Sequence, residues 1–192
     1  MYGVPNVVPI SEAHPTEPIS AYGIGKLAVE KYLHMYHRLE GIGYCALRLS
    51  NPFGPRQRPD KAQGVVTAFL ACVLRNEEVA IWGDGQVVRD YLYVGDAVRA
   101  IVAAGDSSYC GVVNVGSGKG LSINQVLELI ENVVGAPARR RYITGRAFDV
   151  PSNILDISRA ASAIGWAPST SFQDGLRLTA EFLAKANPRQ NW

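Results

Sequence analysis

The sequence predicts an α/β fold, because segments with a helical pattern and short apolar segments alternate along the whole chain. The chain has 192 residues, of which 47% are hydrophobic and 19% are charged. These proportions are typical of a globular protein, and the length suits one compact domain. We therefore expect strands and helices to be mixed throughout.

The first helix and the first strand have the clearest signals. Residues 1–18 contain four prolines and are expected to form an extended loop, and Ser20 after them is suited to cap a helix. The helix is predicted over residues 20–39, where apolar side chains recur at helical spacing, and Gly41 ends it. Residues 44–49 form a short, mostly apolar segment of the kind that is buried inside a parallel sheet.

The rest of the chain continues the alternation. Residues 51–60, NPFGPRQRPD, are predicted to be a loop because of their prolines and glycine. Helices are predicted over residues 64–75, 96–104, 122–134, 157–164 and 173–186, and strands over residues 79–82, 88–93, 112–115 and 141–143. Asp84, Asp90 and Asp96 are expected to be turn or helix-capping residues. The three arginines at residues 139–141 are expected to form the solvated edge of a strand or loop.

Charge and hydropathy exclude several classes of protein. The net charge is +2, from 19 basic and 17 acidic residues, which is too small to imply a surface for nucleic acid or for a membrane. No apolar run approaches the roughly 18 to 20 residues of a membrane span, and residues 1–12 lack the features of a signal peptide. We therefore expect a cytoplasmic protein that binds neither nucleic acid nor membranes.

The cysteines argue against both a disulfide framework and a metal site. There are three of them, Cys45, Cys72 and Cys110, without a CxxC pair and without clustered histidines. We expect buried free thiols and no bound metal.

Three glycine-rich stretches come close to a nucleotide-binding motif without matching it. Residues 23–28 have the GxGxxA spelling inside a predicted helix, and residues 41–46 have it before a strand instead of after one. Residues 116–120, GSGKG, follow a strand, but neither the dinucleotide pattern nor the P-loop pattern is complete. A pyrophosphate is held by backbone amides at a strand-to-helix turn, so the sequence lacks a dinucleotide fingerprint.

Tyr22 and Lys26 are the most suggestive pair of reactive side chains. They are four residues apart on the first predicted helix, and therefore lie on one face about one turn from each other. A phenol is a poor base at neutral pH, and a nearby ammonium group favours its ionised form. On its own the YxxxK spacing is a weak signal.

The surroundings of this pair resemble the extended short-chain dehydrogenase/reductase family, and within it the NAD-dependent epimerases and dehydratases, closest to the UDP-glucose 4-epimerases. The resemblance runs nearly from end to end in five ordered blocks: YGVPNVVPISEAHPTEPISAYGIGKLAVEKYL, LRLSNPFGPRQ, IWGDGQVVRDYLYVGDAVRA, VVNVGSGKGLS and GRAFDVPSNILDISRAASAIGWAP. It implies a doubly wound, Rossmann-type domain that binds NAD, followed by a small mixed α/β substrate domain.

The resemblance also implies which portion of the fold this chain contains. Family members begin with a GxxGxxG turn, whereas Met1 already lies in the segment before the YxxxK helix. Residues 1–62 are expected to be a remnant of the nucleotide-binding domain, and residues 63–192 mainly the substrate domain. We therefore expect a C-terminal portion that does not bind NAD by itself, is inactive alone, exposes apolar surface and forms a homodimer.

By resemblance, the reacting groups lie on the first helix and the first strand. Tyr22 is the base that removes the proton of the sugar 4-hydroxyl while hydride passes from C4 to the nicotinamide. The hydride and the proton then return to the opposite face of the sugar, which inverts its configuration. Lys26 favours the phenolate and bonds the nicotinamide ribose. Leu49 matches a position that lines the nicotinamide pocket, although core packing is the simpler explanation.

The resemblance assigns the remaining site residues to the nucleotide sugar. Arg89 and Arg146 match an arginine pair that grips the diphosphate, and Asn51 matches an asparagine that bonds the diphosphate or the sugar. Trp82 would stack on uracil, and the backbone of Ala80 would read the edge of the base. The competing explanations are surface charges for the arginines, a turn residue for Asn51 and core burial for Trp82.

Two further residues are assigned to the sugars of the substrate. Asp149 matches a carboxylate that binds the ribose. Asn153, four residues later, matches a position beside the C2 substituent, where asparagine leaves room for an N-acetyl group. Its competing explanation is a polar loop residue after Pro151.

The sequence thus predicts the C-terminal portion of an NAD-dependent nucleotide-sugar 4-epimerase of the UDP-glucose/UDP-galactose type, with a UDP-sugar as its partner. Two alternatives stay open: a nucleotide-sugar 4,6-dehydratase or decarboxylase of the same superfamily, and a fragment that binds a nucleotide sugar without catalysis.

Overall fold

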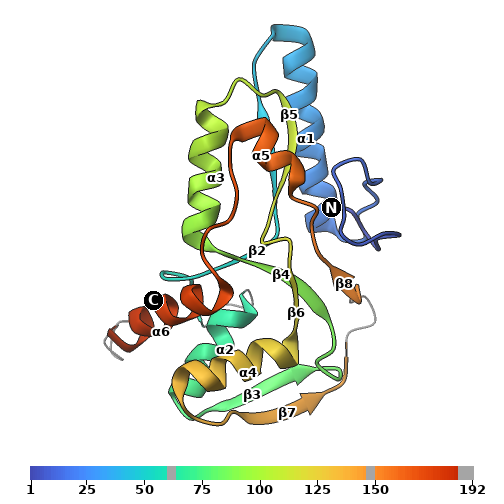
Figure 1. The fold of residues 1–192 in the computed structure, drawn as a ribbon. Helices are drawn as coiled ribbons and strands as arrows, with labels where there is room; N and C mark the ends of the chain where they lie inside the picture. Colours follow the sequence, from blue (N-terminus) through green and yellow to red (C-terminus); the bar gives the residue numbers. More distant parts are fainter. Residues whose placement is uncertain (60–63, 146–149, 186–192) are drawn as a thin grey trace.

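The computed structural model describes residues 1–59, 64–145 and 150–185, and its mixed α/β architecture confirms the predicted class (Figure 1). The helices are α1 (Ala21–Glu40), α2 (Val65–Leu74), α3 (Val94–Asp106), α4 (Ile123–Val134), α5 (Ser158–Ile164) and α6 (Phe172–Lys185). The strands are β1 (Cys45–Leu49), β2 (Asn51–Phe53), β3 (Glu78–Trp82), β4 (Val88–Tyr93), β5 (Gly111–Val115), β6 (Gly120–Ser122), β7 (Arg139–Ile143) and β8 (Ser152–Asn153).

One end of the molecule is built on the parallel strands β1 and β5. Their register runs from Cys45 opposite Gly111 to Leu49 opposite Val115. Helices α3 and α5 cover one face of this pair, where Val113 and Trp166 belong to a buried apolar cluster (Figure 1). In the described part of the chain, β5 is the only strand that pairs with β1.

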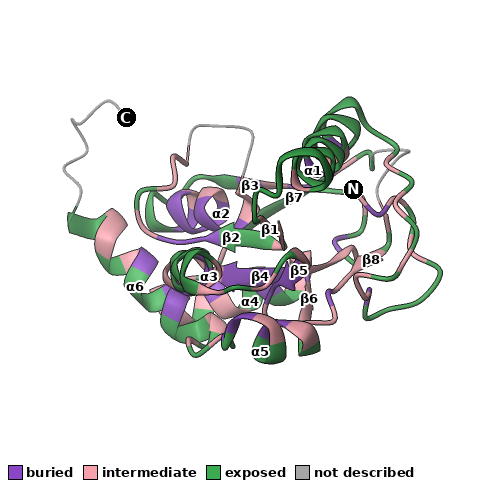
Figure 2. Ribbon diagram, turned by 90° about the horizontal axis from the view of Figure 1, so that it is seen from above, coloured by how far each residue is buried: buried purple, intermediate pink, exposed green. Residues whose placement is uncertain are grey.

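Helix α1 lies on the opposite face of this pair (Figure 2). The Ser20 hydroxyl caps it by accepting the Gly23 N–H at 3.1 Å, and Gly41 ends it in the left-handed conformation, as predicted. Of its 20 residues only Gly23 and Glu30 are buried. The exposed apolar surface that the sequence predicts is therefore present on α1.

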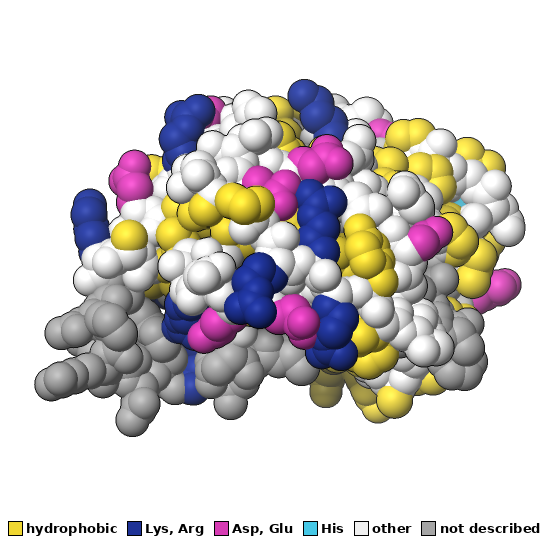
Figure 3. All heavy atoms as spheres, turned by 90° about the horizontal axis from the view of Figure 1, so that it is seen from below, with side chains coloured by type: hydrophobic (Ala, Val, Ile, Leu, Met, Phe, Trp, Pro, Cys, Tyr) yellow, Lys and Arg dark blue, Asp and Glu magenta, His cyan; other side chains and the backbone are white. Residues whose placement is uncertain are grey.

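The other end contains the main apolar core. Strands β3 and β7 are parallel, and α2, α4 and α6 surround a cluster that includes Leu70, Ile81, Leu127 and Leu176. On the face that carries β3, β7 and α4, basic and acidic side chains lie interspersed (Figure 3). The three arginines of residues 139–141 are exposed on β7, as expected, and two of them form ion pairs with Glu131 and Glu78.

Strand β4 connects the two ends. It pairs with β2 and β8 in parallel and with β6 in antiparallel orientation. The sequence predicted none of these three partners, and residues 51–53 were expected to be loop. Strands of two or three residues show no measurable periodicity, and these exist because β4 offers them hydrogen-bonding partners.

Three further expectations need correction. Asp90 is not a turn residue but a fully buried residue of β4, and Asp96 lies buried in the first turn of α3, where its carboxylate accepts hydrogen bonds from Thr170. Cys110 is exposed instead of buried, and the other two thiols are only partly buried. Asp84 is a turn residue as predicted, because its side chain accepts the Gln86 N–H at 2.9 Å.

Candidate active site

Helix α1 presents Tyr22 and Lys26 on one face, as their spacing predicts. Lys26 Nζ lies 5.3 Å from the centroid of the Tyr22 ring. Tyr22 is the second residue of α1, and it is 73% exposed. The phenol is therefore open to a ligand and has a positive charge within reach.

Two cavities meet at Tyr22. The first, of about 500 Å³, lies between α1 and β1 and is lined by Lys26, Val29 and Leu49. The second, of about 510 Å³, is lined by Leu49, Asn51 and Arg89. Tyr22 and Leu49 border both cavities, so Leu49 is not simply a core residue: it is 42% exposed at the junction.

Strand β4 and its neighbours bring three of the predicted substrate residues together. Asn153 on β8 is opposite Arg89, and Asn51 on β2 is opposite Tyr91, two residues further along β4. Opposite residues in parallel strands, and alternate residues in one strand, project to the same face. Asn51, Arg89 and Asn153 therefore share one face of the sheet.

Two of these polar side chains also hold the backbone around them. Arg89 Nη1 donates to the carbonyl oxygens of Val88 at 2.9 Å and Val150 at 2.6 Å, and Asn51 Nδ2 donates to the Asp90 carbonyl at 2.9 Å. Asn51 is thus a residue of strand β2 and not of a turn, and its amide oxygen takes no part in that contact. Both side chains are held in place by these hydrogen bonds to the backbone.

Strand β3 carries the two residues predicted to bind the nucleobase. Val79 and Ile81 are buried, whereas Trp82 is 48% exposed and Ala80 partly exposed on the other face. Core burial of Trp82 is therefore wrong. Neither Trp82 nor Ala80 is among the residues that line the two cavities at Tyr22.

Arg146 and Asp149 lie outside the described residues. The chain that follows them approaches β4: the Val150 carbonyl accepts from Arg89, and the Pro151 carbonyl accepts the Val88 N–H at 2.9 Å. Arg146 and Asp149, which are assigned to the diphosphate and the ribose, are therefore close in sequence to a segment that is hydrogen-bonded to Arg89.

Asp90 is a site-building residue that the sequence did not predict. Its carboxylate accepts the N–H and the hydroxyl of Ser117, at 2.8 and 2.7 Å, and the N–H groups of Gly118 and Leu155, at 3.2 and 3.3 Å. A Cβ atom at Gly116 would lie 2.5 Å from Asp90 Oδ2, so the close approach requires glycine. The amides of this glycine-rich loop are therefore used by a carboxylate of the protein.

Two buried hydroxyl groups also line the second cavity. The Ser50 and Tyr91 hydroxyls have no hydrogen-bond partner among the described residues. Burial raises the pKa of Tyr91 to about 12, even though the neighbouring Arg89 acts in the opposite direction. Tyr91 is thus a neutral phenol beside the guanidinium group, and no sequence motif distinguishes it from a core tyrosine.

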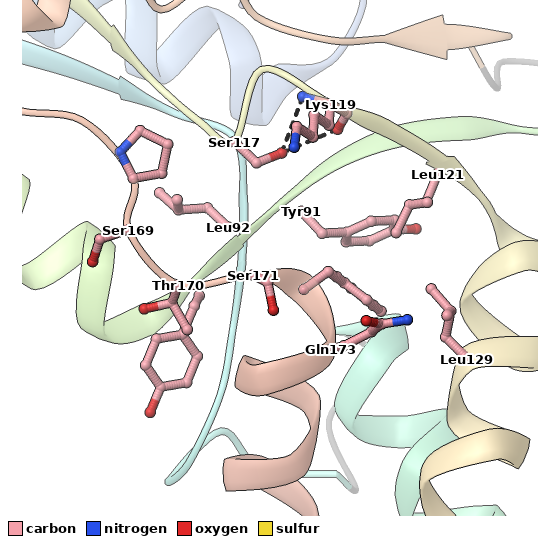
Figure 4. A pocket seen from close by; sticks show the side chains of 13 residues that line it. Tyr91, Leu92, Ser117, Lys119, Leu121, Leu129, Ser169, Thr170, Ser171 and Gln173 are labelled. Atoms are coloured by element: carbon pink, nitrogen blue, oxygen red, sulfur yellow. Dashed lines mark hydrogen bonds between the residues drawn. The ribbon is translucent and has the colours of Figure 1, made fainter.

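A third cavity, of about 560 Å³, lies between β4, β6 and residues 168–173 (Figure 4). Two of its hydroxyl groups bond to buried carboxylates: Ser117 Oγ donates to Asp90, and Thr170 Oγ1 donates to Asp96 at 2.9 Å. None of the predicted site residues lines it. The candidate site is therefore the pair of cavities that share Tyr22.

The described residues contain no group of three or more His, Cys, Asp or Glu side chains that could hold a metal ion. Within the same residues, no helix is both long and apolar enough to cross a lipid bilayer.

Comparison with known proteins shows the family of this chain. The sequence pattern of the NAD dependent epimerase/dehydratase family matches residues 1–116. The chain belongs to this family. A curated relative, the UDP-glucose 4-epimerase of Mycolicibacterium smegmatis, is 37% identical over 183 residues, which are 95% of this chain and 58% of that protein.

Solved structures of epimerases share the fold. The UDP-glucose 4-epimerase of Thermotoga maritima, solved with UDP-glucose, superposes with a TM-score of 0.92 at 41% identity over 96% of this chain and 60% of that one. The UDP-N-acetylglucosamine 4-epimerase of Methanobrevibacter ruminantium gives 0.91 at 33% identity, covering 95% and 59%. The chain thus spans about 60% of the length of these epimerases.

Membership of the epimerase/dehydratase family confirms the Rossmann-type fold class that the five blocks predict. NAD is present in the structure of the Thermus thermophilus UDP-glucose 4-epimerase, which is 34% identical and has a TM-score of 0.89.

Proposed function

We propose that this chain forms the substrate-binding and proton-transferring part of an NAD-dependent UDP-sugar 4-epimerase. The observation that carries the proposal is the position of Tyr22 between two cavities, one beside Lys26 and the other beside Asn51 and Arg89. A base that serves hydride transfer must contact the sugar on one side and the cofactor on the other. Tyr22 borders both spaces.

In this mechanism Tyr22 accepts the proton of the sugar 4-hydroxyl and later returns it. The ammonium group of Lys26 lies 5.3 Å from the Tyr22 ring centroid, so a positive charge stands beside the group that would accept the proton. NAD, when bound, supplies the hydride acceptor and donor at its nicotinamide ring. The change of configuration at C4 requires the sugar to turn between the removal and the return of the hydride, so that the hydride returns to the opposite face.

The residues of this chain fit one end of NAD. Tyr22 and Lys26 would hold the nicotinamide ribose in the cavity between α1 and β1, with Leu49 at its border. The pyrophosphate has no comparable seat in the described residues, because the loop at 116–118 directs its amides to Asp90. We therefore expect the chain alone to be inactive.

Arg89, together with Arg146, would hold the diphosphate, and Asn51 would bond the diphosphate or the sugar. Guanidinium groups suit phosphates because they offer parallel donors. Trp82 and Ala80 would receive the uracil on the exposed face of β3, with Asp149 on the ribose. The exposure of Trp82 supports this assignment, because a large apolar ring on the surface is suited to meet a base.

For the sugar itself we propose a UDP-hexose of the glucose/galactose type, with N-acetylated hexoses also accepted at Asn153. The epimerase from Methanobrevibacter ruminantium, which acts on UDP-N-acetylglucosamine, supports the wider range. A second candidate is decarboxylation: the UDP-glucuronic acid decarboxylase 1 of Xenopus tropicalis is 30% identical over 190 residues.

We further propose a cytoplasmic homodimer. The exposed apolar side chains of α1, such as Ile24 at 56% and Leu39 at 69%, support association with a second copy. Size-exclusion chromatography with light scattering measures the mass, and a monomer at all concentrations would contradict the dimer.

The test of the function has two steps. Calorimetric titration of the chain with UDP and UDP-glucose should show binding of both. A chimera that places this chain after the nucleotide-binding part of the Thermus thermophilus relative should then epimerise UDP-glucose, and Tyr22→Phe should abolish turnover without changing UDP-glucose binding. Near-normal turnover of the variant would mean that another group is the base, and release of carbon dioxide from UDP-glucuronate would favour the decarboxylase.

A further inference from the structure

Apolar packing does little to fix the orientation of helix α1, although α1 carries both reactive side chains. Its large apolar residues are mostly exposed: Val29 is 57% and Tyr36 50% accessible. A helix on a sheet is ordinarily held by a buried apolar stripe. Here the only long side chain of α1 that is buried is charged: Glu30, which is 8% exposed.

Glu30 meets Arg48 of β1 in a paired contact. Glu30 Oε1 lies 2.6 Å from Arg48 Nη2, and Arg48 Nε donates to Glu30 Oε2 at 3.0 Å. The two side chains are 10% and 8% exposed. A two-point contact between a guanidinium and a carboxylate fixes orientation as well as distance, and breaking it would leave an uncompensated charge away from water.

Arg48 is itself held firmly by neighbouring segments. Its guanidinium carbon lies 4.7 Å from the centroid of the Tyr2 ring, and its Nη1 donates to the Glu12 carbonyl at 3.4 Å. The Tyr2 hydroxyl donates to Oδ1 of Asn114 at 2.6 Å, and Asn114 is directly opposite Arg48 on β5. Arg48 thus provides Glu30 with a fixed reference point on the sheet.

Tyr22, Lys26 and Glu30 succeed one another at intervals of four residues, so they lie along one flank of α1. A rotation of α1 that separated Glu30 from Arg48 would move Tyr22 away from the junction of the two cavities. We propose that Glu30 and Arg48 are a positioning pair, which holds the flank of α1 that bears Tyr22 against the ends of β1 and β2. The role of Tyr22 rests on the proposed function, whereas the attachment of α1 can be measured independently of it.

Hydrogen exchange measured by mass spectrometry tests the attachment. In Glu30→Gln and in Arg48→Lys, the amides of α1 should exchange about 100-fold faster, as expected when one partner of a buried pair is altered. The amides of α4 and β4 should keep their protection. Glu131→Gln is the matched control, because it alters a carboxylate that pairs with Arg140 on the surface, and it should leave α1 unchanged.

Ligand affinity provides the readout that a merely stabilising pair would not move. In the two variants the affinity for UDP should stay the same, while the additional affinity that glucose contributes to UDP-glucose is lost, because the ring of Tyr22 no longer borders the cavity that would receive the sugar. Tyr22→Phe, which keeps the ring and removes only the hydroxyl, should retain that affinity. Unchanged exchange of α1 would overturn the proposal, and so would equal acceleration in α1, α4 and β4. If the parent chain binds no UDP, the proposed function fails, and the exchange rates of α1 still decide whether the pair positions the helix.

Discussion

Arg89 and Asn153 lie directly opposite each other on the parallel strands β4 and β8. The contact is reinforced by the Arg89 guanidinium, which donates to the Val150 carbonyl three residues before Asn153. The residue proposed to hold the diphosphate and the residue proposed to meet the C2 substituent are therefore neighbours on one face. A sugar attached to a diphosphate at Arg89 would be within reach of Asn153.

Asn153→Tyr should discriminate against N-acetylated sugars. A tyrosine in this half-buried position would collide with an acetamido group, whereas the 2-hydroxyl of glucose is smaller. We expect the affinity for UDP-N-acetylglucosamine to fall at least about 10-fold more than that for UDP-glucose. Titration calorimetry with both ligands measures the ratio, and Asn153→Ala, which adds no bulk, is the control. Equal losses for the two ligands would remove Asn153 from the sugar site.

Arg89→Ala should weaken UDP binding by about 1.5 to 3 kcal/mol, the usual contribution of a charge-assisted hydrogen bond. Uridine has no phosphate, so its affinity should not change. Arg177→Ala is a suitable control, because Arg177 is an exposed arginine on α6 that pairs with Asp174. An unchanged affinity for UDP in Arg89→Ala would show that the diphosphate binds elsewhere.

Trp82 should report on the nucleobase through its fluorescence. It is 48% exposed, whereas Trp166 is buried at 4%, so of these two tryptophans a stacked uracil would quench Trp82. The third, Trp192, lies outside the described residues, and the Trp82→Phe variant separates its emission from that of Trp82. We expect UDP to quench the chain, pyrophosphate to leave the emission unchanged, and Trp82→Phe to remove the quenching by UDP. Quenching that persists in Trp82→Phe would place the base away from β3.

The long elements of the fold could be predicted, because each carries its own signal. Helix α1 is delimited by Ser20 and Gly41, and α4 by a capping box in which the Ser122 hydroxyl accepts the Gln125 N–H. The short strands β2, β6 and β8 could not be predicted, because a pair or triplet of residues has no period and depends on an edge of β4 that is formed elsewhere in the sequence.

Residues of the candidate site can be predicted where a sequence motif contains them. They cannot be predicted where their role depends on contacts with distant segments of the chain. The YxxxK spacing together with the family blocks predicts Tyr22 and Lys26, and the proposed site residues of β4 and β8 follow from the same blocks. Glu30 and Asp90 carry no such mark: an acidic residue on a helix or after an arginine is ordinarily solvated. Their burial follows from partners in distant segments, Arg48 in one case and the loop at 116–118 in the other.

Asp90→Asn should destabilise the chain by about 2 to 4 kcal/mol, because the substituted amide would point N–H groups at donors that need an acceptor. The Asp90 carboxylate accepts four hydrogen bonds, from Ser117, Gly118 and Leu155. Urea denaturation measures the loss. Asp84→Asn is the matched control, because asparagine can accept the same turn hydrogen bond from Gln86 on the surface, and its effect should stay below about 0.5 kcal/mol. Equal effects of the two substitutions would contradict the buried role of Asp90.

Amides of the glycine-rich stretches form hydrogen bonds within the protein, and these bonds limit how the chain could bind the pyrophosphate of NAD. The Gly23 N–H donates to the Ser20 hydroxyl inside the helix cap, and the Gly41 N–H donates to the His37 carbonyl at the helix end. The amides of Ser117 and Gly118 donate to Asp90. A pyrophosphate requires several amides that point at it from a helix N-terminus, and in each of these stretches at least one amide is already bonded within the protein.

We therefore predict that the chain by itself binds no NAD at micromolar concentration, although it binds UDP. Tyr22 and Lys26 offer contacts to the nicotinamide ribose alone, and one or two hydrogen bonds of about 1 kcal/mol each do not offset the loss of translational and rotational freedom on binding. Calorimetric titration with NAD should show no heat above dilution, while UDP added to the same sample shows that the protein is folded and competent. Tyr22→Phe should give the same two results, because it removes only a hydroxyl that would contact the nicotinamide ribose. Stoichiometric binding of NAD to the parent chain would mean that a pyrophosphate seat exists in this chain, and loss of that binding in Lys26→Met would show that the nicotinamide ribose lies beside α1.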